Sequence, residues 1–166
     1  MSLDNIQLPP FLIGELYKNS LVDADNQQLK AELLEANKVT FLGKNQKNIL
    51  LIVQEENAVY LPDNDLNFLV EILSACKLSL SDTALINVFK NKEANYTSLL
   101  EKFKPVTIIF FGIEPVKLEF PLQFPHYQLQ QYNNQTYLSA PSLSELAADI
   151  NKKKQFWVCL KKLFSI

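Results

Sequence analysis

The sequence contains no arginine, and glycine, cysteine and histidine are all scarce. All 16 basic residues are lysine, against 18 Asp and Glu residues, so the formal net charge is -2 and the pI is about 5.5. Proteins dedicated to nucleic acid usually carry a basic excess and use arginine for forked contacts to phosphate and guanine. We therefore expect weak direct binding to nucleic acid, or none.

The other scarcities exclude several kinds of site. Three scattered glycines cannot build a phosphate-binding loop. Two cysteines, Cys76 and Cys159, cannot form a disulfide framework or a metal cluster, so we expect free buried thiols. The longest apolar runs, 49–53 and 106–111, are far shorter than the roughly 20 residues of a membrane helix. Without a recognisable export leader, the sequence predicts a cytoplasmic protein with no membrane span and no cofactor.

Alternating strand and helix patterns fill the middle of the chain. Uniformly apolar runs predict buried strands, and apolar residues at helical spacing after Pro62 predict a helix. A short helix over 96–103, ended by Pro105, separates the last two of these strands. The predicted buried strands are 48–53, 83–89 and 106–111. This alternation predicts a three-layer α/β/α domain with a central, mostly parallel sheet. One or two further strands are expected near an edge, between Phe120 and Tyr137.

The last 25 residues predict a helix. Ser142 and Glu145 form an S-x-x-E capping box directly after Pro141. A first apolar face follows from Leu143, Leu146, Ala147 and Ile150, and a second from Phe156, Trp157, Leu160, Leu163 and Phe164. Asn151 is expected to break or re-cap the helix between the two faces. The lysines Lys152–Lys154 are either a solvated helix face, which is the default, or a binding patch.

The N-terminal residues suggest a separate segment within a single domain of residues 1–166. Phe11, Leu12, Leu16 and Tyr17 share one face of a possible helix. That face either packs on the rest of the domain, as ordinary amphipathic helices do, or binds a partner. We divide the chain into a helical or interaction segment, 1–40, and a core, 45–164.

Ligands of open parallel sheets bind beyond the carboxyl ends of the strands. Three places qualify here: Gln54–Glu56, the pair Asn87 and Asn91, and 112–114. Glu55 is a candidate general base or water-orienting group, although a solvated acidic loop is the favoured interpretation. His126, the only histidine, is expected to be packed or hydrogen-bonded. No spacing of serine, cysteine or metal ligands around it indicates a catalytic centre.

The order of these segments resembles the uracil-DNA glycosylase superfamily, especially its iron–sulfur type, over about residues 45–164. The strand and loop 51–57 stand where that family has a Gly-Glu-Ala-Pro-Gly loop, and 68–75 followed by 82–88 match its helix and its strand ending in Thr-Asn. Ile108–Gly112 matches a strand that enters a glycine. Thr136–Leu143, followed by Lys154, Trp157 and Lys161, resembles the family's late T-Y-H-P-S-x-L block. The resemblance implies a glycosylase-like fold.

The chain departs from that family at the groups that catalyse. Ala140 stands where the family has the histidine that stabilises the uracil anion, and losing one such donor typically costs about 100–1000-fold in rate. Of the first loop only Glu55 is retained, and the four cluster cysteines are missing. The resemblance therefore leaves Glu55, Asn87, Ala140 and Ser142 as degenerate candidates for catalytic positions.

The psi-subunit family of bacterial DNA polymerase III is similar in this respect, because it resembles a glycosylase that no longer catalyses. Its late block corresponds here to Ala140–Leu143 followed by Phe156 and Trp157. That resemblance implies a non-catalytic accessory of the clamp loader, engaged through the N-terminal segment with Phe11, Leu12, Leu16 and Tyr17 as anchors, while the body binds another replication protein. Two alternatives stay open. One is an active glycosylase, with Glu55 orienting water and Asn87 reading the base. The other is an interaction domain of unrelated role.

Overall fold

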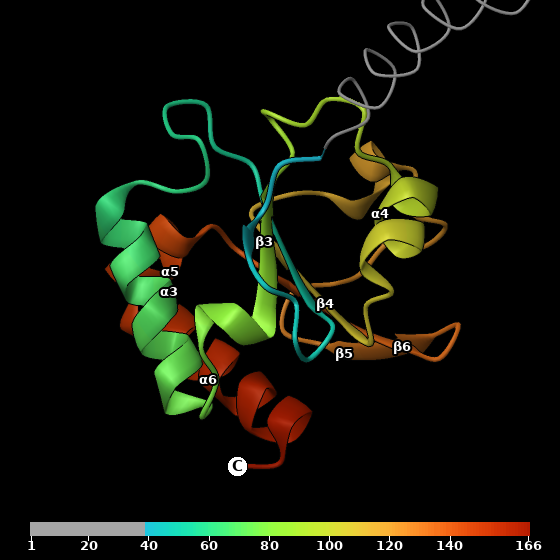
Figure 1. Cartoon of the computed structure of the whole chain (residues 1–166). Coiled ribbons are helices and arrows are strands. Elements are labelled where there is room, and N and C mark those ends of the chain that lie inside the picture. The colour runs from blue at the N-terminus through green and yellow to red at the C-terminus, as the bar shows by residue number, and fades with distance from the viewer. Residues whose placement is uncertain (1–38) are drawn as a thin grey trace, which may run out of the picture. The chain divides into compact units, whose positions relative to one another are not determined.

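The computed structural model describes residues 39–166, which form one unit (Figure 1). The predicted N-terminal anchors lie outside the described residues, and so does nearly all of the predicted segment 1–40. The expectations for Phe11, Leu12, Leu16 and Tyr17 therefore stay predictions from sequence.

A mixed sheet of six strands organises the described residues. Its order is β1-β3-β2-β4-β6-β5. The four inner strands run parallel, whereas β1 and β5 pair antiparallel at the two edges. The bounds are Leu42–Gly43 for β1, Ile49–Val53 for β2, Thr83–Asn87 for β3, Thr107–Phe111 for β4, Leu129–Tyr132 for β5 and Gln135–Ala140 for β6. This confirms the prediction of a mostly parallel sheet in an α/β fold.

The three predicted buried strands are present as β2, β3 and β4, and every residue within the bounds of these three strands is buried. Their mostly apolar sequences suit this burial, because parallel inner strands are covered on both faces. The second strand ends at Asn87, two residues before its predicted end at Phe89. The reason is a side-chain turn, since the Asn87 Oδ1 accepts the backbone N–H of Phe89 at 3.1 Å and bends the chain out of the sheet.

The last two strands lie at and beside one edge of the sheet, which confirms the expectation of strands near an edge. β6 lies inside the sheet, between β4 and β5, and only β5 is an edge. The prolines that indicated an edge, Pro121 and Pro125, lie in the segment before β5 and not in a strand. Asn133 and Asn134 form the turn of the β5–β6 hairpin with φ angles of 51° and 59°. Two positive φ angles characterise the turn type that fits the twist of hairpins, and asparagine tolerates them.

Helices cover both faces of the sheet. In Figure 1, α3 (Asp63–Ala75), α5 (Leu143–Ala148) and α6 (Ile150–Phe164) lie on one face, and α4 (Tyr96–Phe103) lies on the other. α4 has its predicted bounds. It begins with a capping box in which the Asn95 side chain accepts from the Ser98 N–H at 2.9 Å, and it ends at Lys104 in a left-handed conformation before Pro105.

The C-terminal helix is divided in two at Asp149. The Asp149 side chain accepts the N–H groups of Asn151 at 2.8 Å and Lys152 at 3.3 Å, and so caps α6. The predicted break is therefore present but lies two residues before Asn151. Because α6 starts anew, Ala147 and Ile150 point away from the core, and the prediction that they belong to the first apolar face was wrong. Ile150 is 65% exposed.

The predicted capping box at α5 is only half formed. The Ser142 Oγ accepts the N–H of Glu145 at 3.4 Å. The Glu145 carboxylate instead contacts Lys152, at 2.9 Å, across the break between the two helices. The acidic side chain thus joins α5 to α6.

Two apolar cores lie on the two faces of the sheet. The core under α3, α5 and α6 is mostly aliphatic and includes Cys76 and Cys159 among its buried residues. Both cysteines are free, as predicted. The α4 side is aromatic: the rings of Phe124 and Tyr137 stack with centroids 4.5 Å apart, and Phe110 meets Phe120 edge to face. Within residues 39–166 no helix has the length and apolarity needed to cross a membrane.

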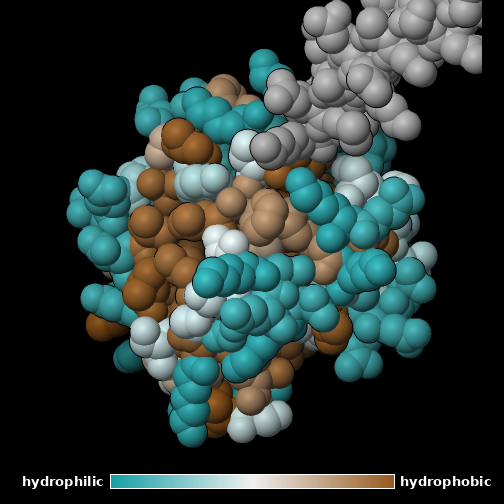
Figure 2. All heavy atoms as spheres, in the orientation of Figure 1, coloured by the Kyte–Doolittle hydropathy of each residue, from teal (hydrophilic) through white to brown (hydrophobic). Residues whose placement is uncertain are grey.

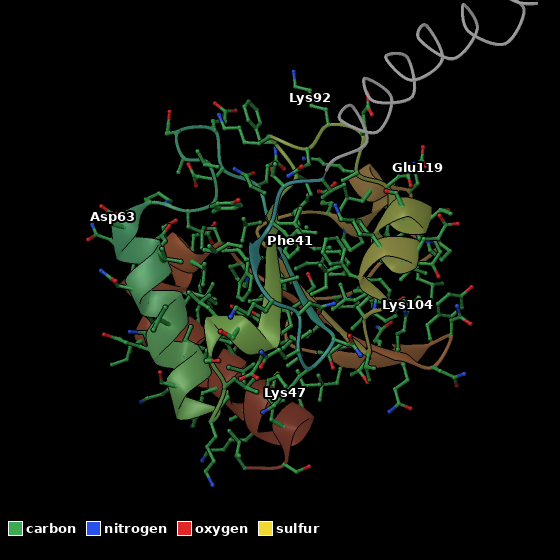
Figure 3. The ribbon with its side chains drawn as sticks, in the orientation of Figure 1. Phe41, Lys47, Asp63, Lys92, Lys104 and Glu119 are labelled. Carbon is green, nitrogen blue, oxygen red and sulfur yellow. The ribbon has the colours of Figure 1, made fainter. Side chains whose placement is uncertain are left out.

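The surface is mostly hydrophilic, but not evenly so. Figure 2 shows hydrophobic side chains gathered beside α3, with hydrophilic ones around them. In Figure 3, Lys92 points outward at the top of the view and Glu119 lies beside α4, whereas Phe41 lies over the sheet. The ring of Phe41 meets Phe103 of α4 edge to face at 5.0 Å. The segment before β1 is thereby fastened to the aromatic side of the fold.

Candidate functional site

The carboxyl ends of the four parallel strands form a straight row. Val53 of β2 pairs with Asn87 of β3 on one side and with Phe111 of β4 on the other, and Phe111 pairs with Ala140 of β6. We call these four residues and the loops that follow them the strand-end rim. The strand order reverses at β2, so ligands of such sheets are expected at this rim. All three predicted site loops and Ala140 lie on it.

Asn87 holds the first rim loop closed. Its side chain is completely buried. The Nδ2 donates to the carbonyls of Glu55 at 2.7 Å, Ala58 at 3.1 Å and Val59 at 3.2 Å. The Oδ1 accepts the N–H groups of Glu55 at 3.0 Å and Phe89 at 3.1 Å. Both donor hydrogens and both acceptor lone pairs of the amide are thus used by the backbone. Asn87 builds the loop and has no capacity left to read a base.

The Asn91 side chain holds the segment that leads into β1 through hydrogen bonds to its backbone. Its Oδ1 accepts the Thr40 N–H at 2.8 Å, and its Nδ2 donates to the carbonyls of Thr40 at 3.1 Å and Asn87 at 2.8 Å. An asparagine amide imitates a strand partner in this way, because it offers one donor and one acceptor side by side. The two candidate asparagines are therefore structural links between loops.

Glu55 faces the beginning of α3. Burial, and after it the negative charge of Glu55, raises the pKa of Asp65 in the first turn of that helix. Glu55 is half-buried, and both its backbone groups are held by Asn87. The candidate base is thus on a fixed loop beside a second carboxyl group.

Ala140 and Ser142 pack against the loop after β4. Ala140 is completely buried in the core under α5 and α6, and its carbonyl accepts the Gly112 N–H at 2.9 Å. Gly112 has a φ of +63°, and a Cβ at this position would lie 2.9 Å from the Ser142 Cβ. Only glycine fits so close an approach in this conformation. Position 140 is on the rim, as the resemblance implies, but its side chain contributes to the core.

A cleft of about 790 Å³ opens on the other half of the rim, between the loop 112–117, the loop 123–127 and the starts of α5 and α6. His126 lies on its wall, exposed to solvent, with Nδ1 3.0 Å from the Oγ of Ser139. Ser139 is 1% exposed, so it orients the imidazole but offers no reachable nucleophile. The prediction that His126 is hydrogen-bonded is confirmed. Sequence reasoning missed Ser139, because a bridge between two segments 13 residues apart brings it beside His126.

Charged and phenolic groups complete the cleft. The hydrogen bond and charge of Lys152 lower the pKa of Glu145, and Glu145 in turn raises the pKa of Lys152. Burial raises the pKa of Tyr127, and its buried hydroxyl has no hydrogen-bond partner among the described residues. Neither Glu55 nor Asn87 lines this cleft. Within residues 39–166 no cluster of three or more metal-ligating side chains occurs.

No protein-family model matches the chain, and no curated protein matches it. The resemblance to the glycosylase superfamily thus rests on the sequence motifs described above.

Proposed function

We propose that this protein is a non-catalytic subunit that binds other proteins, and that it acts as a psi-like accessory of the DNA polymerase III clamp loader. The observation that supports a non-catalytic role is that the candidate catalytic positions of the strand-end rim are occupied by structural side chains. The amide of Asn87 is taken up by the backbone, and Ala140 is buried where an anion-stabilising imidazole would be needed. The clamp-loader part rests on the resemblance of the late block from Ala140 to Trp157.

Apolar surface supports a role in binding proteins. Ile150 is 65% exposed, and it lies with the half-buried side chains of Ile72 and Trp157 around one apolar hollow between α3 and α6. Exposed apolar side chains that gather in patches mark protein interfaces more often than catalytic sites. The charge distribution supports the same role, since a net charge of -2 without arginine disfavours direct binding to DNA.

The direct test is binding of the tagged full-length chain to purified clamp-loader complex, measured by size-exclusion chromatography and interferometry. We expect a stable complex. The double variant F11A/Y17A removes two of the sequence-predicted anchors and is expected to weaken the complex at least about tenfold, which corresponds to roughly 1.4 kcal/mol. The matched control is V116A, which removes an exposed apolar side chain from the described part of the chain. Absence of binding to the clamp loader would refute the proposal.

A second candidate function, base excision, is favoured by one observation: the cleft beside His126 places an imidazole next to the strand that ends at Ala140. Incubation of excess protein with a uracil-containing duplex, followed by alkaline cleavage of abasic sites, tests it. We expect no cleavage above the background of the H126A variant. Cleavage that H126A abolishes would replace the first proposal by this one.

A further inference from the structure

A groove of about 380 Å³ separates α3 from α6. Phe68 and Ile72 of α3 form one side of its floor, and Trp157 and Leu160 of α6 form the other. Both helices pack against α5, which leaves the space between them unfilled by the described residues. We call this feature the α3–α6 groove. An apolar floor of this kind between two helices can receive the apolar face of a third, amphipathic helix.

The two helices that form the groove carry charges of opposite sign. The charged residues of α6 are five lysines, without an acidic residue, and those of α3 are three acidic residues, without a basic one. On the groove itself these charges are Lys153 and Lys154 on one rim and Glu71 on the other. The ion pairs found in residues 39–166 join other groups, Lys47 to Asp82 and Lys152 to Glu145. The groove lysines are thus not neutralised by an acidic side chain of the described part.

The Lys153 side chain extends over the floor of the groove. Its Nζ lies 4.9 Å from the centre of the Phe68 ring, over the apolar floor. Such a contact is weak at an exposed site, and it stabilises the ammonium group less than a hydrogen-bonded carboxylate and a filled floor would together. An acidic partner would therefore draw the ammonium group off the ring and uncover the floor.

We propose that the α3–α6 groove binds an amphipathic helix of a partner protein, with its apolar face on the floor and acidic residues paired to Lys153 and Lys154. The 13 residues of α3 correspond to a length of about 20 Å, which a bound helix of three to four turns would match. The inference rests on the proposed role in binding proteins and names the chemistry of the partner: a helix with leucine-like residues on one face and glutamate or aspartate beside them.

The chain contains its own reporter of binding. Trp157 is its only tryptophan, and it lines the groove. The probes are two synthetic helices of about 16 residues with the same leucine face, one flanked by glutamates and the other by lysines. Titrated into the full-length chain, the glutamate-flanked helix is expected to shift the Trp157 emission to shorter wavelength, and to bind at least about tenfold more tightly than the lysine-flanked helix.

Charge reversal sharpens the test. The double variant K153E/K154E is expected to invert the preference, so that the lysine-flanked helix binds more tightly. I150S removes an exposed apolar side chain of the groove and is expected to weaken both complexes about fivefold or more, whereas V158S changes a similarly exposed residue of α6 outside the groove and is expected to have no effect. Circular dichroism establishes that each variant is folded.

Three outcomes would overturn the inference: no change in Trp157 emission with either helix, equal affinity for both, or a preference unaltered by K153E/K154E. Concentration-dependent dimerisation that I150S abolishes would also overturn it, because a second copy would then be the occupant. Failure here is separable from failure of the proposed function. If the chain binds the clamp loader but neither helix, only the groove assignment is wrong; if it binds the acidic helix but no clamp loader, only the proposed partner is wrong.

Discussion

The strand-end rim and the α3–α6 groove use their side chains in opposite ways. At the rim, Asn87 and Asn91 are buried and bonded to the chain's own backbone. In the groove, Ile150 is 65% exposed and Lys153 covers an apolar floor without an acidic partner among the described residues. The asparagines that indicated chemistry thus stabilise the fold, and the apolar and lysine side chains that indicated an ordinary helix lie at the surface of the described residues.

This difference separates stability from binding. A buried polar group that loses its partners costs free energy of folding, whereas an exposed group contributes little to it. Substitutions at the rim should therefore lower the free energy of unfolding, whereas substitutions in the groove should leave that free energy nearly unchanged and alter only what the protein binds. The following predictions test that separation, in order of decreasing effect.

Asn87 should give the largest change in stability. N87A leaves five backbone groups without their partner, so we expect the free energy of unfolding to fall by about 3 kcal/mol, measured by urea denaturation. N87D is a sharper variant, because a carboxylate still accepts from Glu55 and Phe89 but cannot donate to the three carbonyls. It should also be strongly destabilised at neutral pH. A near-native unfolding midpoint for both variants would mean that the rim is not held by this side chain.

Ser139 should show a smaller effect on the open half of the rim. S139A removes the hydrogen bond to the His126 Nδ1 and should lower the free energy of unfolding by about 1 kcal/mol. Because His126 is the only histidine, its ring protons are assigned without ambiguity in an NMR spectrum. We expect their contacts to the β6 strand to weaken in S139A. Unchanged ring contacts would show that packing, and not Ser139, orients the imidazole.

The Glu145–Lys152 pair predicts a modest dependence on pH. The pKa of Glu145 is lowered in the folded state. The stabilisation by Glu145 is therefore present above its ordinary pKa of 4.5 and is lost as the pH falls through the lower folded-state pKa. Between about pH 6 and pH 3, the wild-type chain should lose more stability than E145Q. Parallel urea midpoints of the two proteins over this range would contradict the pairing. Both side chains are exposed, so the difference should be small.

The groove should give the smallest effect on stability. I150S replaces a largely exposed side chain and should change the free energy of unfolding by less than about 0.5 kcal/mol. The same variant is expected to weaken binding of the acidic helix. A loss of stability comparable to that of S139A would show that Ile150 contributes to the core, and would remove the contrast with the rim.

The sheet and most of the helices were predictable because their signals are local. The strand 49–53 is uniformly apolar and 107–111 is apolar after Thr107, and the helix 96–103 has its cap at Asn95 and its proline stop at Pro105. The break at Asp149 was harder to place, because aspartate and asparagine two residues apart are both good caps and only packing decides between them.

The position of the strand-end rim could be predicted from the sequence, but the roles of its side chains could not. Strand ends in a parallel sheet converge at one edge, so Glu55, Asn87 and Ala140 were correctly placed there. Their roles depend on contacts between residues that lie far apart in the sequence, such as Asn87 with Val59 at 28 residues' separation. The proximity of Ser139 to His126, and the groove between α3 and α6, depend on tertiary packing in the same way.

The bonds between Asn91 and Thr40 have a mechanical consequence. Thr40 precedes β1, a strand of only two residues, and is tied on both its N–H and its carbonyl to Asn91, whose Nδ2 also donates to the Asn87 carbonyl. A force applied to the chain upstream of Val39 therefore acts on Asn91 through its bonds to Thr40. Through Asn91 the force also acts on β3 and on the loop that Asn87 holds. Under a pulling force this short antiparallel pair should rupture first, at a force far below that needed to shear the four parallel strands apart.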